Sequence, residues 1–253
     1  GGGERGCYVG FKIRHKKQVT PTEAGRRLLE ITRRMFDAEQ QALELLSESR
    51  PLRSGTLRIV ADAAHHLLHI LGRFRRKYPG IHVAVRAGNT ETVIASLYSY
   101  EADIGVLGEV PAGRDFEVVR LNSTPVVAFV SIGHPLARAG SLSVEELAQL
   151  PLVMRERGSR TRAKLEELAA AHGLELKPAM EAEGREAVRE IVASGAGVGF
   201  VSAAEFGHDA RLVQIPIAAP QMLMDEALIC LRERSGGKLV RAFLDIAGSM
   251  AVR

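Results

Sequence analysis

The chain has 253 residues, of which 46% are hydrophobic and 25% are charged, and its formal net charge is +4. This composition is typical of a soluble globular protein, and the length suffices for one large domain or two modest ones. No apolar run approaches the roughly 18 residues that a membrane helix needs, and the first ten residues lack the apolar core of a secretory signal. We therefore expect a cytoplasmic protein that is neither embedded in a membrane nor exported.

The two cysteines, Cys7 and Cys230, lie far apart, with no second Cys or His at ligand spacing beside either. This usage suits a reducing compartment and predicts neither a disulfide framework nor a metal site.

The positive charge is concentrated at the start of the chain. Residues 1–34 hold nine basic and three acidic side chains, a balance of +6, so the other 219 residues must sum to −2. A positive end on a nearly neutral body indicates a polyanionic partner for that end, most often nucleic acid. A solvated basic tail is the alternative.

Residues 11–19 predict a two-stranded hairpin with a basic tip. Apolar Phe11, Ile13 and Val19 surround the cluster Arg14-His15-Lys16-Lys17. Such a tip can contact backbone phosphates, which fixes position on DNA without reading sequence. The candidate DNA-binding residues are Lys12, Arg14, Lys16 and Lys17.

A long helix is predicted over residues 21–50. Thr20 can cap it, Pro21 suits the first helical position, and Glu23 would complete a capping box. The helix would end before Pro51, with a length of about 40 Å. Apolar residues then recur by threes and fours, the spacing of a two-helix seam, at Leu28, Ile31, Met35, Ala38, Ala42 and Leu45. The seam favours pairing between two subunits, and packing against the body of the same chain is the alternative.

From residue 56 onward, short strands alternate with helices. The first series has strands at 56–61, 81–88 and 102–108, with helices at 63–78 and 90–100. Strands at 117–121 and 125–131 and a capped helix at 143–150 follow, with Ser143 and Glu146 as a capping box. A second series covers 152–202, and a strand at 225–233 and a helix at 237–250 close the chain. This order predicts an α/β protein with a mainly parallel sheet, in two lobes around a cleft.

Several of these segments resemble one family. "VTPTEAG" at 19–25 with Leu28 and Leu29, "GHPLA" at 133–137 and "REAVREIVASGAGVGFVSAAE" at 185–205 are similar to LysR-type transcriptional regulators. The resemblance implies a winged helix-turn-helix head, a dimerising linker helix and a two-lobed effector domain of the periplasmic-binding-protein-like fold. Only about 18 residues precede Thr20, so we expect the groove-reading helix of that head to be missing from this chain.

By this likeness, residues 1–20 are the remnant of the head and residues 21–50 are the linker helix. The effector domain is 56–253, with lobe I at 56–130 and 225–253 and lobe II at 131–224.

One candidate effector site is the stretch "RERGSRTRAK" at 155–164. Ser159, Arg160 and Thr161 stand at the first turn of a helix, where free N–H groups, hydroxyls and a guanidinium can bind an anion. In the alternative reading, Ser159 only caps the helix and Arg160 and Arg162 face water.

"VADAAHHLL" at 60–68 occupies the matching position in lobe I. Asp62, with Ala63 and His65 beside it, could face a cationic ligand group, or Asp62 could cap the next helix. His65, His66 and His69 invite a metal reading, but no carboxylate or thiolate is identified to complete the shell, so we predict no metal site.

Other strand ends contribute further candidates. Each one, taken singly, reads as a turn or cap, and the hypothesis is that they converge on one cleft. They are Asn89, Thr90, Gly108, Glu109, Glu183, Arg185 and Ser202.

A narrower resemblance concerns the effector. "ADAAHHLL", "AGNTETV", "ERGSRTRA" and "CLRER" look like regulators associated with 2-aminoethylphosphonate catabolism. This implies a zwitterionic effector, with its phosphonate at Ser159 to Thr161 and its ammonium against Asp62 or Glu183.

The sequence thus favours an effector-responsive regulator that acts on DNA as a homodimer or homotetramer, without a cofactor. A stand-alone solute-binding protein is the alternative, but it would predict an export signal and no heptad rod. An enzyme is not expected, because nucleophile-elbow, phosphate-loop, zincin and paired-cysteine motifs are missing.

Overall fold

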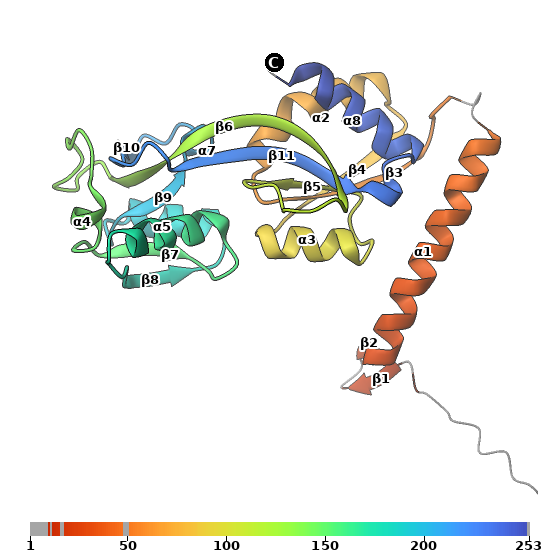
Figure 1. Cartoon of the computed structure of the whole chain (residues 1–253), viewed down its shortest axis with the longest axis horizontal. Helices are drawn as coiled ribbons and strands as arrows, with labels where there is room; N and C mark the ends of the chain where they lie inside the picture. Colours follow the sequence, from red (N-terminus) through yellow and green to blue (C-terminus); the bar gives the residue numbers. More distant parts are fainter. Residues whose placement is uncertain (1–9, 11, 16–17, 48–50, 252–253) are drawn as a thin grey trace, which may run out of the picture. The chain divides into compact units, whose positions relative to one another are not determined.

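The computed structural model describes residue 10, residues 12–15, residues 18–47 and residues 51–251 (Figure 1). The chain divides into two compact units, Gly1–Pro51 and Leu52–Arg253. Within the described residues, no helix is both long and apolar enough to cross a membrane.

The first unit begins with the predicted hairpin. Strands β1 (Lys12–His15) and β2 (Gln18–Pro21) pair antiparallel, with Lys12 opposite Pro21 and His15 opposite Gln18. Lys12 and Arg14 therefore lie on β1, whereas Lys16 and Lys17 lie outside the described residues.

Helix α1 (Glu23–Leu46) starts two residues later than the sequence predicted. Thr20 and Pro21 stay in the β2 ladder, so their backbone is extended and neither can begin a helix. Thr22 is the cap instead, and its hydroxyl accepts a hydrogen bond of 3.1 Å from the Gly25 N–H. None of the residues of α1 is buried, and the predicted seam residues Leu28, Ile31, Met35 and Leu45 are 42–68% exposed.

The first lobe of the second unit is built on three parallel strands. β3 (Gly55–Ala61) lies between β4 (Ile81–Ala87) and β5 (Ile104–Leu107). Helices cover both faces of this sheet (Figure 1). The alternation along β3 places Leu57 and Ile59 toward α2 (Leu68–Lys77) and α8 (Lys238–Met250), and Val60 toward α3 (Thr90–Tyr98). A 3₁₀ turn, η1 (Ala64–Leu67), links β3 to α2.

The second lobe has its own core. Its strands are β7 (Leu152–Arg155), β8 (Pro178–Ala182), β9 (Gly199–Ser202) and β10 (Leu212–Pro216), and its helices are α4 (Val144–Leu147), α5 (Arg160–Ala171), α6 (Arg185–Ala193) and α7 (Ala203–Phe206). The capping box of Ser143 and Glu146 is confirmed, with bonds of 2.7 and 3.2 Å. β10 was not predicted.

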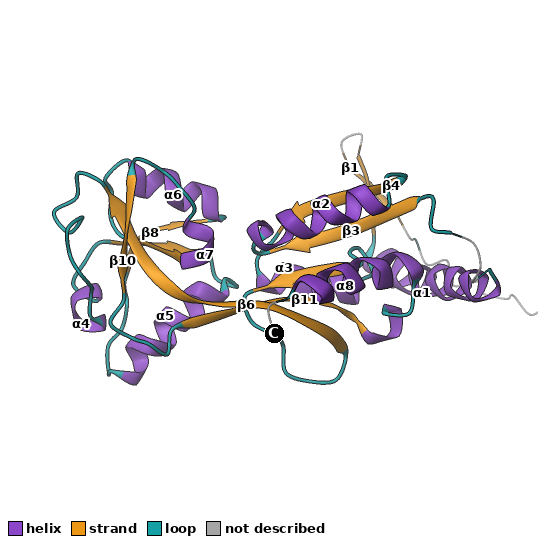
Figure 2. Cartoon of the chain, turned by 90° about the horizontal axis from the view of Figure 1, so that it is seen from above, coloured by secondary structure: helices purple, strands orange, loops and turns teal. Residues whose placement is uncertain are grey.

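Two long antiparallel strands, β6 (Phe116–Ser131) and β11 (Leu223–Leu231), run between the lobes (Figure 2). β6 is one strand of 16 residues where the sequence predicted two, because Asn122 to Pro125 remain paired with β11. β11 is antiparallel to β5, so the sheet is mixed rather than mainly parallel. Val126, Ala128 and Val130 already pack in the core of the second lobe, which therefore begins before the predicted boundary at residue 131.

Candidate functional site

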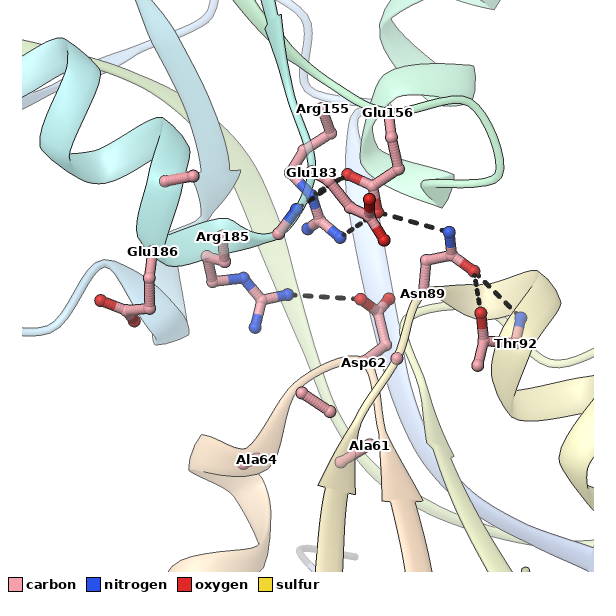
Figure 3. A pocket seen from close by; sticks show the side chains of 14 residues that line it. Ala61, Asp62, Ala64, Asn89, Thr92, Arg155, Glu156, Glu183, Arg185 and Glu186 are labelled. Atoms are coloured by element: carbon pink, nitrogen blue, oxygen red, sulfur yellow. Dashed lines mark hydrogen bonds and ion pairs between the residues drawn. The ribbon is translucent and has the colours of Figure 1, made fainter. Parts of the chain in front are cut away.

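A cavity of about 650 Å³ lies between the two lobes, where β3, β4 and β7 end and α6 begins (Figure 3). Its polar lining mixes both signs of charge and comes from both lobes. The lining residues that carry polar side chains are Asp62, Asn89, Thr92, Arg155, Glu156, Glu183, Arg185 and Glu186. Ligands of α/β proteins bind at such strand ends.

Asp62 and Arg185 face each other across this cavity. Asp62 directly follows β3, and its side chain is 6% exposed. Arg185 Nη2 lies 3.5 Å from Asp62 Oδ1, and Arg185 Nη1 lies 2.5 Å from Glu205 Oε2. Burial raises the pKa of Asp62, against the opposing effect of the Arg185 guanidinium. The Arg185 guanidinium is therefore paired with two buried carboxylates, and Arg185 lines the cavity.

Arg155 and Glu156 form a tighter pair at the end of β7. Arg155 Nε and Nη2 donate to Glu156 at 2.8 and 2.9 Å. Glu156 also accepts the Gly184 N–H at 3.1 Å and the Asn89 amide at 3.3 Å, so it connects the two lobes. Burial alone would raise the pKa of Glu156, but the Arg155 guanidinium and the Gly184 N–H lower it to about 2.

The start of α6 is open to the cavity. Gly184 occupies the N-cap position with φ 85° and ψ 152°, a conformation that side chains disfavour, and no side chain caps the helix. Gly184, Arg185, Glu186 and Ala187 all line the cavity. A helix start with exposed N–H groups beside a guanidinium is an anion-binding arrangement.

The predicted anion site at the start of α5 does not reach this cavity. Ser159 is buried and its hydroxyl caps the helix by accepting the Arg162 N–H. Arg160 is bound by Glu109 and by Glu167, with 2.8 Å to the latter, and Thr161 is buried. The structure thus matches the capping alternative for Ser159, while Arg160 pairs with acids rather than facing water.

Of the predicted effector residues, the structure brings Asp62, Asn89, Glu183 and Arg185 to the cavity. Asn89 both caps α3, by accepting the Thr92 N–H at 3.0 Å, and contacts Glu156 of the other lobe. The remaining candidates do not line the cavity.

Each of these outliers has a structural explanation. Ala63 is buried as the residue before η1, and His65 on η1 is exposed. Thr90 begins α3, and although it does not line the cavity, its buried hydroxyl lies beside Asp62 and helps to lower the pKa of that carboxyl. Ser202 is buried where β9 meets α7. Gly108 packs against β11 so closely that an added Cβ would lie 2.2 Å from Met224 Cε.

The sequence analysis did not name Thr92, Arg155, Glu156 or Glu186 as lining residues, although Arg155 and Glu156 begin the stretch 155–164 that it singled out. Arg155 and Glu156 end the strand "LVMRE", so their place at a strand's carboxyl end was a usable signal. Glu186 gave none, because a Glu in the first turn of a helix is an ordinary feature.

Comparisons with known proteins place the chain in a family. Residues 50–251 match the family model for the LysR substrate binding domain. The transcriptional activator CmpR of Synechocystis is 30% identical over 188 residues, which are 74% of this chain and 62% of CmpR. The regulator CbbR of Rhizobium meliloti is 30% identical over 219 residues, which are 85% of this chain and 69% of CbbR.

Solved structures agree with this assignment. The regulatory domain of Synechocystis CcmR in complex with 2-PG aligns with a TM-score of 0.70 at 25% identity, over 78% of this chain and 98% of that domain. Full-length OxyR of Pseudomonas aeruginosa aligns with a TM-score of 0.73 at 18% identity, over 96% of this chain and 82% of OxyR, which supports the fold alone. The chain, which spans about six tenths of the length of CmpR, belongs to the LysR family of transcriptional regulators.

Proposed function

We propose that this chain is the sensing and dimerising part of a LysR-type transcriptional regulator, and that its cavity binds a small anionic or zwitterionic effector. The observation that carries the proposal is Arg185, which stands at the uncapped start of α6 and faces Asp62 of the other lobe. A site that offers both a cationic and an anionic group suits a ligand that carries both charges.

The ligand's anionic group would bind the N–H groups at the start of α6 and the Arg185 guanidinium. This placement replaces the one at Ser159 to Thr161, because those residues do not line the cavity and Ser159 already caps α5. An ammonium group would then contact Asp62, or Glu183, which also lines the cavity. Asp62 belongs to the first lobe and Arg185 to the second, so one ligand would bridge the two.

Such a bridge gives the site a way to signal. A ligand that contacts Asp62 and Arg185 together binds most tightly where both lobes are within its reach, so it favours that arrangement over a more open one. Binding without turnover is expected, since the relatives CmpR and CbbR are named as regulators.

The effector itself is tested with a panel of ligands. 2-Aminoethylphosphonate is compared with ethylphosphonate, which lacks the ammonium, with ethanolamine, which lacks the phosphonate, and with 2-PG, found in CcmR. We expect 2-aminoethylphosphonate to raise the melting temperature most, and its NMR spectrum to stay unchanged after incubation. A larger shift with 2-PG or ethylphosphonate would refute the zwitterion, and conversion of the ligand to product would refute the regulator.

Dimerisation through α1 is the second part of the proposal. Its seam residues are exposed in the single chain, and a second copy of the helix would cover them. Ile31→Lys with Met35→Lys should shift the protein toward monomer in analytical ultracentrifugation. Gln40→Lys, on another face of α1, is the control and should leave the assembly unchanged. An unchanged assembly in the double variant would exclude this seam.

DNA contact through the hairpin is the third part. Lys12 and Arg14 lie on β1, and with Lys16 and Lys17 they would contact phosphates in addition to the contacts of a DNA-binding head. Replacing Lys16 and Lys17 with Gln should lower the slope of log affinity against log salt by roughly two for DNA binding. An unchanged slope would remove these residues from the interface.

A further inference from the structure

A second polar cluster lies at the boundary between the lobes, formed by His66, Glu205 and Glu226. They come from η1, α7 and β11, which are three separate elements. His66 Nε2 lies 3.7 Å from Glu226 Oε1 and 4.0 Å from Glu205 Oε1. One imidazole nitrogen and one oxygen of each carboxylate all lie within 4.8 Å of one another.

These side chains are buried, and several of their polar atoms lack hydrogen-bond partners. The side chains of His66, Glu205 and Glu226 are 7, 3 and 2% exposed. Within the described part of the chain, His66 Nε2, Glu205 Oε1 and Glu226 Oε2 make no hydrogen bond, whereas Glu205 Oε2 is paired with Arg185 Nη1. Buried polar atoms normally have partners, because an unpaired one costs free energy of desolvation. The cluster therefore has the unpaired polar atoms that a bound ligand or ion would need.

The charge of the cluster indicates a cation. Asp62, Glu205 and Glu226 are three buried carboxylates, and Arg185 is the cation that contacts two of them, Asp62 and Glu205. Within the described residues, the one ion-pair contact of Glu226 is with His66. A bound dication would place a positive charge among these buried carboxylates.

Each of the three side chains offers an atom suited to a metal. His66 offers the imidazole nitrogen Nε2, which lies nearest to both carboxylates and is a common metal ligand in its neutral form. The two carboxylate oxygens of Glu205 have different neighbours: Oε2 contacts Arg185, and Oε1 is the atom nearest His66. Arg185 would thereby orient the Glu205 carboxylate from outside the metal's ligand set.

We propose that His66, Glu205 and Glu226 form a binding site for a divalent first-row transition-metal ion that joins the two lobes and β11. A nitrogen ligand beside two carboxylates suits zinc and its neighbours rather than magnesium or calcium, which take oxygen ligands alone. Ligand atoms in a tetrahedral zinc site lie roughly 3.4 Å apart, somewhat less than the 3.7 and 4.0 Å that separate His66 Nε2 from the two carboxylates. The site does not depend on the effector proposed above.

Zinc is the probe for the test. Metal-free protein is titrated with ZnCl₂ by calorimetry, and its melting temperature is measured with and without zinc. We expect one tight zinc site that needs these ligands. At a free zinc concentration of 100 times Kd, the melting temperature should rise by roughly 5–10 °C. Glu226→Gln, which keeps size and shape, should weaken zinc binding about 100-fold or more, since even outer partners are worth 10–100-fold.

The neighbouring histidines supply the matched controls. His65→Gln and His69→Gln remove imidazoles one and three residues from His66, and neither should change zinc affinity more than twofold. Equal affinity in Glu226→Gln and the parent protein, or a large loss in either control, would overturn the proposal, as would a parent protein that binds no zinc.

A measurement on the unaltered chain guards against a variant that fails to fold. X-ray absorption of the one-to-one zinc complex should show a single imidazole among nitrogen and oxygen ligands at about 2.0–2.2 Å. Two or more imidazoles, or any sulfur ligand, would place the metal elsewhere and refute the site.

Discussion

The starts of α5 and α6 look alike in the sequence but differ in the structure. Both follow a strand in the second lobe, and both place Arg in the first helical position, as Arg160 and Arg185. Ser159 caps α5 away from the cavity, whereas Gly184 lines the cavity and provides no side-chain cap to α6. A helix start is available to a ligand only where the chain has not already satisfied it. The difference therefore directs the effector to α6.

The largest expected effect tests this difference directly. Arg185→Gln should weaken the best effector of the panel about 10–100-fold, because a charge-assisted hydrogen bond contributes about 1.5–3 kcal/mol. Arg160→Gln, the matched change on α5, should alter affinity less than twofold. Calorimetric titration of both variants measures this. Equal losses of effector affinity in the two variants would contradict the assignment of the effector to the start of α6.

The conformation of Gly184 gives the next effect. Gly184→Ala should lower the free energy of unfolding by about 1–3 kcal/mol, because its backbone region is nearly exclusive to glycine and an added Cβ meets no neighbour within 4 Å. Gly133→Ala, also in open space but without positive φ, is the control and should change little. Urea denaturation measures the free energy of unfolding of both variants. Equal losses in Gly184→Ala and Gly133→Ala would contradict the role of the positive φ.

The cap of α5 should affect stability and not binding. Ser159→Ala removes the hydroxyl that accepts the Arg162 N–H, at a cost of about 1 kcal/mol in unfolding free energy. Effector affinity, measured by titration, should stay within twofold. A clear loss of affinity without loss of stability would return the anion site to α5.

The smallest effect concerns Glu156, which holds the Gly184 N–H. Its folded pKa of about 2 lies below the ordinary 4.5, so the ionised form stabilises the fold above pH 4.5 and loses this effect as pH falls toward 2. Solvent screening limits the gain to about 0.5–1 kcal/mol. The stability difference between the parent protein and Glu156→Gln should shrink from pH 7 to pH 3, and a constant difference would disprove the linkage.

The sequence was informative about elements and less so about their partners. The hairpin at 12–21, the long helix and the α/β order were predictable, because alternation, caps and breakers are local signals. The continuity of β6 was not, since Asn122 to Pro125 looks like a turn and is extended only because β11 pairs beside it.

The site, too, was predictable in its single residues but not in their partners. Asp62 and Arg185 could be proposed from strand ends and helix starts, but their pairing joins residues more than a hundred positions apart. Glu205 and Glu226 had no motif, because acids on a helix and a strand are ordinary until burial is known. His66 could not be distinguished from His65 and His69 for the same reason.

β6 and β11 also determine how the lobes can move. The register of their ladder shifts between Glu226 and Ala227, beside a candidate metal ligand. An antiparallel ribbon resists stretching along its backbone and yields by twisting, most easily where a bulge interrupts its ladder. We therefore expect relative twisting of the lobes to concentrate near Glu226, and an ion bound there would restrict it.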